Sequence, residues 1–213
     1  PSPLRNLRND ALLQKVGIDV GVRTEGKWAR VQTNVHLLNM LGVRWVLSEH
    51  PQPDALLKTH MESPVHVYEN TDAMPLAFLV GCVHSTDDPW SALDTLQPNV
   101  WAISEEDVGL PACQTALHGG SVEVVRTVSD HREMHVESPA EALLVWTETH
   151  APGWTVSVNG TEQTIHRVNW NFRGVRVPAG SSTIEWRYEP VWLGAALPLA
   201  SLSWMSLLLG LRR

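Results

Sequence analysis

The chain has 213 residues, 43% of them hydrophobic, which is enough to bury the core of one medium-sized domain with an appendage. The formal net charge of −7 and the scarcity of lysine exclude nucleic acid as a partner, because phosphate binding requires a basic stripe. The sequence begins PSPLRNLRND, without an initiating methionine or a signal peptide, so we expect a fragment whose earlier transmembrane segments supply the export signal.

The first 120 residues mix helical and strand signals. Asn34 is a predicted N-cap before apolar residues at helical spacing, and Gly42 follows where a helix stop belongs. Another predicted helix has Asp87 or Asp88 as its N-cap and Pro89 in its first turn. In chain order we expect a helix at 10–17, a helix at 34–41, a strand at 43–47, a helix at 55–61, strands at 65–69 and 76–83, a helix at 88–96 and irregular chain at 98–120.

From residue 121 the pattern changes to strands, expected at 122–128, 134–137 and 142–149 and then repeatedly to residue 190. Apolar and polar residues alternate with period two at 154–159 and 183–188, as in half-buried antiparallel strands. The predicted strands are separated by residues that are typical of turns, at Pro152-Gly153, Asn159-Gly160 and Pro178-Ala179-Gly180. The spacing of roughly ten residues between strands predicts a β-sandwich.

The segment 191–211 (VWLGAALPLASLSWMSLLLGL) has no charged residue and is followed directly by Arg212-Arg213. Its length as a helix is roughly 31 Å, close to the ~30 Å hydrocarbon core of a bilayer. We therefore expect a transmembrane helix whose terminal arginines stay cytoplasmic, which puts the sandwich on the extracytoplasmic side. Pro198 and three serines keep the alternative of a buried helix in a soluble domain open.

The sequence offers little for metal or acid–base chemistry. His131 and His135 lie where a turn leads into a predicted strand, and on a strand they would share one face. No third ligand is evident, so we interpret them as two solvated polar residues and expect no metal site in this chain. Adjacent acids, such as Asp87-Asp88, are typical of solvated loops, and neither a nucleophile elbow nor a phosphate-binding loop is present. Cys82 and Cys113 could pair outside the cytoplasm, or Cys82 could be a buried thiol within an apolar strand.

Tryptophan is unusually abundant, with ten residues in this chain. An indole face can stack on a sugar ring, but it can equally fill a core, because each ring buries a large area. Polar side chains beside one of the tryptophans could bind saccharide hydroxyls or satisfy strand-end backbone groups. The candidate glycan contacts are Trp154, Asn169, Trp170 and Arg173.

Several strings in the chain resemble the C-terminal region of the bacterial YfhO-like membrane proteins. They are APGWTVSVNG, NWNFRGVRVPAG and IEWRYEP before the last hydrophobic segment, and LLNMLGVRWVLS and VHVYENTDAMPLAFLV upstream. The resemblance covers most of residues 34–211, with Leu76 as a departure, since arginine often follows the proline there. The residues in these strings are typical of structural roles rather than catalytic ones, so the resemblance assigns no catalytic residue to this chain.

The resemblance implies part of a GT-C-type glycosyltransferase, which uses a polyprenyl-phosphate sugar donor to modify cell-envelope glycopolymers. The implied location is the bacterial plasma membrane, with membrane lipid as a further partner. The catalytic acid would lie in an early extracytoplasmic loop that this chain lacks. No cofactor is expected here, and a divalent metal is left open for the full-length protein. The alternatives are a noncatalytic, membrane-anchored β-sandwich that binds glycans or envelope proteins, and an accessory module of a soluble glycosidase.

The sequence thus predicts an α+β fold with three parts. A mixed helix and strand part at 1–120 leads into an antiparallel β-sandwich of jelly-roll or immunoglobulin-like type at 121–190. A single transmembrane helix at 191–211 completes the chain.

Overall fold

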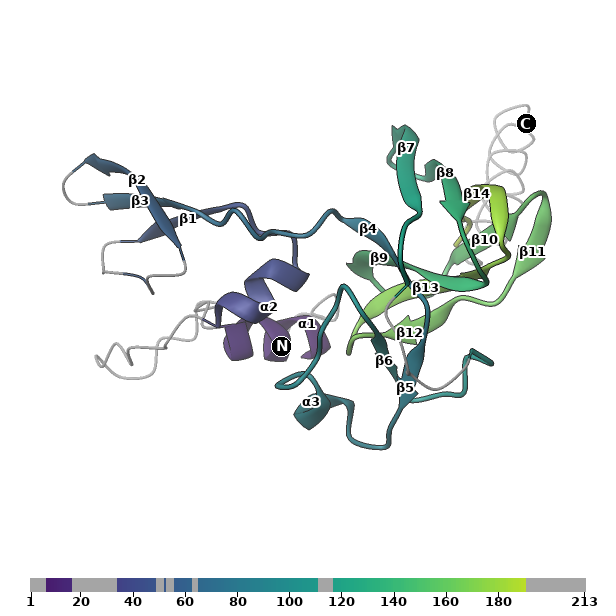
Figure 1. The fold of residues 1–213 in the computed structure, drawn as a ribbon, viewed down its shortest axis with the longest axis horizontal. Coiled ribbons are helices and arrows are strands. Elements are labelled where there is room, and N and C mark those ends of the chain that lie inside the picture. The colour runs from purple at the N-terminus through teal and green to yellow at the C-terminus, as the bar shows by residue number, and fades with distance from the viewer. Residues whose placement is uncertain are drawn as a thin grey trace, which may run out of the picture.

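The computed structural model describes residues 7–16, 34–48, 52, 56–62, 65–110 and 117–190. Within these ranges the chain is mostly β-structure, arranged as three sheets with three helices (Figure 1). The helices are α1 (Leu7–Val16), α2 (Val35–Met40) and α3 (Pro89–Ala92). The predicted caps are confirmed: the Asn34 side chain accepts a hydrogen bond from the Leu37 N–H, and Asp88 accepts one from Ser91.

A six-stranded sheet forms the middle layer. Its strands, in spatial order, are β4 (Ala77–Val80), β9 (Ala142–Thr149), β13 (Phe172–Val177), β12 (His166–Val168), β6 (Ala102–Ser104) and β5 (Val83–Ser85). Neighbouring strands are antiparallel except β5 and β6, which run parallel. The predicted strand at 142–149 coincides with β9. The one predicted at 76–83 is divided, because the chain bends at Gly81.

A five-stranded antiparallel sheet forms the second layer. Its strands, in spatial order, are β11 (Thr161–Gln163), β10 (Trp154–Val158), β14 (Gly180–Tyr188), β8 (His131–Ser138) and β7 (Ser121–Val128). The predicted Asn159-Gly160 turn joins β10 to β11, with φ of 51° and 77° at its two residues. Asn159 also accepts a hydrogen bond from the Thr183 N–H at 2.9 Å, which fixes the turn against β14.

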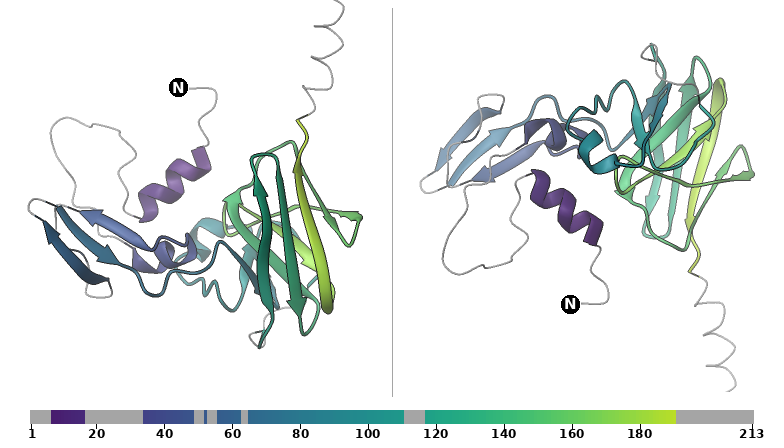
Figure 2. Two further views of the ribbon diagram at one scale, coloured as in Figure 1. Left: turned by 90° about the horizontal axis from the view of Figure 1, so that it is seen from above. Right: turned by 90° about the horizontal axis from the view of Figure 1, so that it is seen from below.

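The five- and six-stranded sheets face each other across an apolar layer (Figure 2). Alternate residues of β8, β9, β10, β13 and β14 point into this layer, and Leu144 and Trp146 of β9 meet Val156 of β10 and Ile184 of β14 there. The predicted antiparallel, β-rich fold with a few helices is therefore confirmed.

The other face of the six-stranded sheet is covered by the helices. Leu12 of α1, Leu37 of α2 and Leu93 beside α3 pack in one cluster with Leu143 and Val145 of β9. Strand β9 is therefore buried on both faces, which explains its unbroken apolar run, since a strand between two apolar layers does not alternate.

A small three-stranded sheet lies to one side of the sandwich (Figure 1). Its strands, in spatial order, are β1 (Trp45–Ser48), β3 (Val65–Glu69) and β2 (Leu57–Glu62). The predicted strand at 65–69 is confirmed as β3. The helix predicted at 55–61 is wrong, because this segment pairs with β3 as β2, and strand pairing overrides a weak helical propensity.

Three other expectations concern an irregular stretch, a pair of cysteines and a domain boundary. The irregular stretch predicted at 98–120 contains β6, which the sequence analysis missed. Cys82 is bonded in a disulfide, and Cys113, the other cysteine of the sequence, lies outside the described residues. The predicted boundary at residue 120 stays a prediction, and strand pairing crosses it, since β4 pairs with β9.

No helix in the described part of the chain is long and apolar enough to cross a membrane. The transmembrane helix predicted at 191–211 lies outside the described residues.

Candidate glycan-contact site

One end of the sandwich gathers tryptophan and arginine side chains between the two sheets. Strand pairing brings Arg173 of β13 beside Trp146 of β9, and Arg132 of β8 beside Trp186 of β14. The rings form a contact series: Trp146 lies 5.2 Å from Trp186 and 5.7 Å from Trp154, measured between ring centres. Two of the four predicted glycan contacts, Trp154 and Arg173, belong to this cluster.

Arg173 is the most deeply buried charge of the cluster, with 3% of its surface exposed. Its guanidinium carbon lies 4.0 Å from the ring centre of Trp154 and 4.7 Å from that of Trp146, within reach of cation–π attraction. The Nε atom donates to the Thr149 carbonyl at 2.9 Å, and Nη2 lies 3.8 Å from the Glu148 carboxylate.

Burial lowers the pKa of Arg173 to about 10, an effect that the nearby Glu148 carboxylate opposes and the Arg132 charge reinforces. The guanidinium is therefore still protonated at neutral pH. The cluster thus holds a desolvated positive charge between two indole faces, while Trp154 itself is half-buried.

The other two predicted contacts, Asn169 and Trp170, lie in the turn between β12 and β13, where both have positive φ. Asn169 is fully buried and forms a reciprocal pair with Ile103. Its N–H donates to the Ile103 carbonyl at 2.8 Å, and its Oδ1 accepts from the Ile103 N–H at 2.9 Å. These bonds connect β6 to the turn.

Trp170 packs against the helical side of the molecule. Its indole N–H donates to the Arg8 carbonyl at 2.8 Å, the Arg8 guanidinium lies 4.5 Å from its ring centre, and the Trp90 ring lies 4.9 Å away. Arg8 in turn donates two hydrogen bonds to Glu105. The structure thus brings together Trp154 and Arg173, and separately Asn169 and Trp170. As glycan contacts, all four remain predictions.

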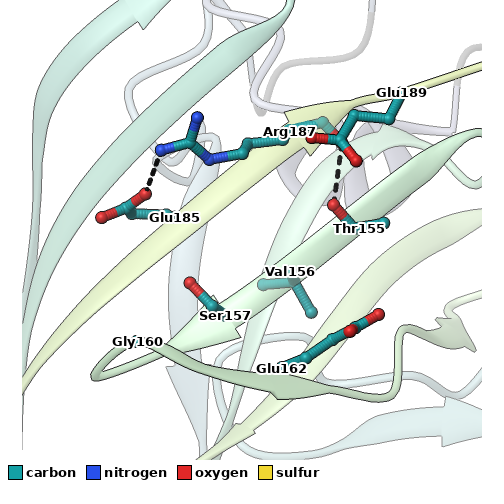
Figure 3. Close-up of a pocket in the computed structure, with 8 residues that line it drawn as sticks. All are labelled: Thr155, Val156, Ser157, Gly160, Glu162, Glu185, Arg187 and Glu189. Atoms are coloured by element: carbon teal, nitrogen blue, oxygen red, sulfur yellow. Dashed lines mark hydrogen bonds and ion pairs between the residues drawn. The ribbon is translucent and has the colours of Figure 1, made fainter.

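A polar groove of about 240 Å³ lies on the outer face of the five-stranded sheet, over β10, β11 and β14 (Figure 3). It is lined by Thr155, Val156, Ser157, Gly160, Glu162, Glu185, Arg187 and Glu189. Period-two alternation directs the polar residues of β10 and β14 to this face while their neighbours fill the core. The alternation in the sequence indicated that polar face, but nothing in it distinguished these residues as a site.

Within the groove, Arg187 donates to Glu185 at 2.7 Å, and this hydrogen bond lowers the pKa of the Glu185 carboxyl. The hydroxyls of Thr155 and Ser157 lie on the neighbouring strand (Figure 3). Carboxylates accept hydrogen bonds, guanidinium groups donate them and hydroxyls do both, so the groove suits a ligand rich in hydroxyl groups. Among the described residues, no three His, Cys, Asp or Glu side chains are arranged to hold a metal ion.

The fold and the groove define a β-sandwich domain with a polar sheet face open to solvent. Residues 109–199 match the family model described as "Bacterial membrane protein YfhO". The resemblance to the YfhO-like proteins is therefore confirmed, over a stretch that includes every strand of the five-stranded sheet.

The arabinofuranosyltransferase AftD from Mycobacteria, a solved structure, is 25% identical over 36% of this chain, with a TM-score of 0.30. The match covers 6% of the AftD chain, and a TM-score of this size does not establish a shared fold. No curated protein matches the chain.

Proposed function

We propose that this chain is the extracytoplasmic C-terminal domain of a polytopic, GT-C-type membrane glycosyltransferase. Such an enzyme transfers a sugar from a polyprenyl-phosphate donor to a cell-envelope glycopolymer. The observation that carries the proposal is the match of residues 109–199 to a family of bacterial membrane proteins. The chemistry belongs to other parts of the enzyme, and this domain holds the acceptor glycan in the groove of the five-stranded sheet.

The composition of the groove supports a glycan ligand. Sugar hydroxyls need donors and acceptors held at fixed positions, and a sheet face holds side chains more rigidly than a loop does. The Glu185–Arg187 pair is already arranged by its own hydrogen bond, so less side-chain freedom is lost on binding.

Two observations support an extracytoplasmic, membrane-attached location. Cys82 is in a disulfide, a bond that persists outside the reducing cytosol. Directly after Pro190 the sequence continues with twenty-one residues that carry no charge and then two arginines, the pattern of a span with a cytoplasmic end.

Thiol labelling of intact cells tests the location. Glu137 is exposed on β8, so a Glu137→Cys variant of the full-length protein should react with a membrane-impermeant maleimide before the cells are permeabilised. Labelling that appears only after permeabilisation would overturn the extracytoplasmic assignment.

Titration with cell-envelope polysaccharide fragments tests the glycan role. We expect Glu185→Gln to weaken binding roughly tenfold, because a hydrogen bond to a charged group is worth about 1.5–3 kcal/mol. Glu137→Gln is the matched control, since Glu137 is on the same sheet but outside the groove. Equal losses in the two variants, or no binding by the unmodified chain, would refute the groove as the acceptor site.

A further inference from the structure

Two N–H donors in the tryptophan and arginine cluster are buried and have no hydrogen-bond partner among the described residues. They are Nη1 of Arg173 and Nε1 of Trp186. Both side chains contact the ring of Trp146: the Arg173 guanidinium carbon lies 4.7 Å and the Trp186 ring 5.2 Å from its centre. Buried polar groups in folded proteins are nearly always paired, because an unpaired one loses its hydration without replacement.

The charges around these donors are not balanced. The Arg132 guanidinium lies 5.9 Å from the ring centre of Trp146, so two arginines border this ring. The carboxylate near Arg173 is that of Glu148, whose side chain is 45% exposed and which lies beyond hydrogen-bond distance. An anionic oxygen would supply both the missing acceptor and the missing negative charge.

The cluster lies at the end of the sandwich where β14 finishes, since Trp186 is two residues before the end of that strand. Tyr188, the last residue of β14, is 38% exposed, and its ring lies 5.4 Å from that of Trp154. Three residues later the uncharged stretch 191–211 begins. Aromatic residues with one apolar and one polar side, next to arginines, are typical of the level of lipid headgroups.

We propose that Arg132, Arg173 and Trp186 bind the phosphate group of a membrane lipid. The phosphate oxygens accept hydrogen bonds from Nη1 of Arg173 and Nε1 of Trp186, and Arg132 adds a second positive charge. Trp154 and Tyr188 pack against the glycerol and the first carbons of the acyl chains. Rotation of the half-buried Trp154 side chain uncovers the guanidinium for the phosphate. The site rests on the membrane location given under the proposed function.

The test uses the full chain in uncharged maltoside micelles, with the indole N–H signal of Trp186 as the reporter in nuclear magnetic resonance spectra. The signal is assigned by its loss in Trp186→Phe. Three probes are titrated: dihexanoyl phosphatidic acid, dihexanoylglycerol, which lacks the phosphate, and inorganic phosphate. We expect the phosphatidic acid to shift the signal with saturation, the diacylglycerol to leave it in place, and inorganic phosphate to bind more weakly than the lipid.

Three variants separate binding from folding. Arg173→Lys and Arg132→Gln should each weaken phosphatidic acid binding roughly 10- to 100-fold, because the first removes the guanidinium hydrogen bond to the phosphate and the second removes a positive charge beside it. Arg176→Gln is the matched control, since Arg176 is on the same strand as Arg173 but pairs with Glu141. Arg132 is half-buried, so its variant keeps the test valid if Arg173→Lys does not fold.

The outcomes are distinct. Inorganic phosphate that binds as tightly as the lipid would overturn the lipid assignment. An unchanged Trp186 signal in every titration, or an equal loss in Arg176→Gln, would overturn the site. These results leave the thiol labelling and the polysaccharide titration unaffected, so failure of this site and failure of the proposed function are recognised separately.

Discussion

Replacement of Asn169 tests whether this residue stabilises the fold. Asn169 is buried at a φ of +47°, and its Oδ1 is the acceptor for the N–H of the buried Ile103. In Asn169→Ala this N–H loses its partner, which costs about 1–3 kcal/mol. The left-handed backbone conformation also costs alanine about 1–2 kcal/mol, and this cost is smaller for asparagine. We expect a total loss of about 2–4 kcal/mol.

Asn169→Gly separates the two contributions. Glycine loses the same acceptor but adopts positive φ without strain, so we expect it to be about 1 kcal/mol more stable than Asn169→Ala. Urea unfolding of the full chain in maltoside micelles, followed by tryptophan fluorescence, gives both free energies of unfolding.

Two results would refute this reasoning. If Asn169→Ala unfolds at the wild-type urea concentration, the bond to Ile103 contributes nothing measurable. If it keeps its stability but no longer binds polysaccharide, Asn169 is a ligand contact, as the sequence analysis proposed. Equal stabilities of the alanine and glycine variants would contradict only the backbone contribution.

Three further predictions concern single side chains. Trp186→Ala should destabilise the domain by about 3–5 kcal/mol in the same urea assay, and Trp154→Ala by less, because Trp154 is only half-buried. Gly42 has a φ of +67°, and a Cβ there would lie 2.9 Å from the Met74 carbonyl oxygen. Gly42→Ala should therefore lower the free energy of unfolding by at least about 1 kcal/mol, the cost of the backbone conformation alone. A hydrogen bond from Arg8 lowers the pKa of Glu105, so this carboxylate stabilises the fold above its ordinary pKa of 4.5 and the contribution is lost as the pH falls. Unfolding measured against pH should therefore show a shallower acid limb in Glu105→Gln, and an unchanged limb would contradict the assignment.

Local features of the fold could be predicted from the sequence because their causes are local. The caps at Asn34 and Asp88 depend on a side chain and an N–H a few residues apart. The Asn159-Gly160 turn needs only two residues that tolerate positive φ. Strand β9 was predicted at its observed limits because its apolar run ends in polar residues.

Features that depend on distant partners could not be predicted. Strand β6 has three residues and is held in place by β5 and by the turn at Asn169, which its own sequence does not reveal. Residues 57–62 form a strand because β3 lies beside them.

The same distinction between local causes and distant partners applies to the candidate site. The alternation of polar residues on β10 and β14 indicated an open polar face, where the groove lies. The position of Arg173 between two indole rings depends on the β9–β13 register and on contact between the two sheets, so only the structure revealed it.

The pairing of β4 with β9 has a consequence for biosynthesis. Strand β4 ends at Val80 and its partner begins at Ala142, so a ribosome adding ~5–20 residues per second makes the first strand on the order of 3–12 s before the second. During that interval an apolar strand edge is exposed without its neighbour. A chaperone that holds the nascent segment would therefore have its greatest effect before β9 emerges, and slower elongation within residues 81–141 should increase aggregation.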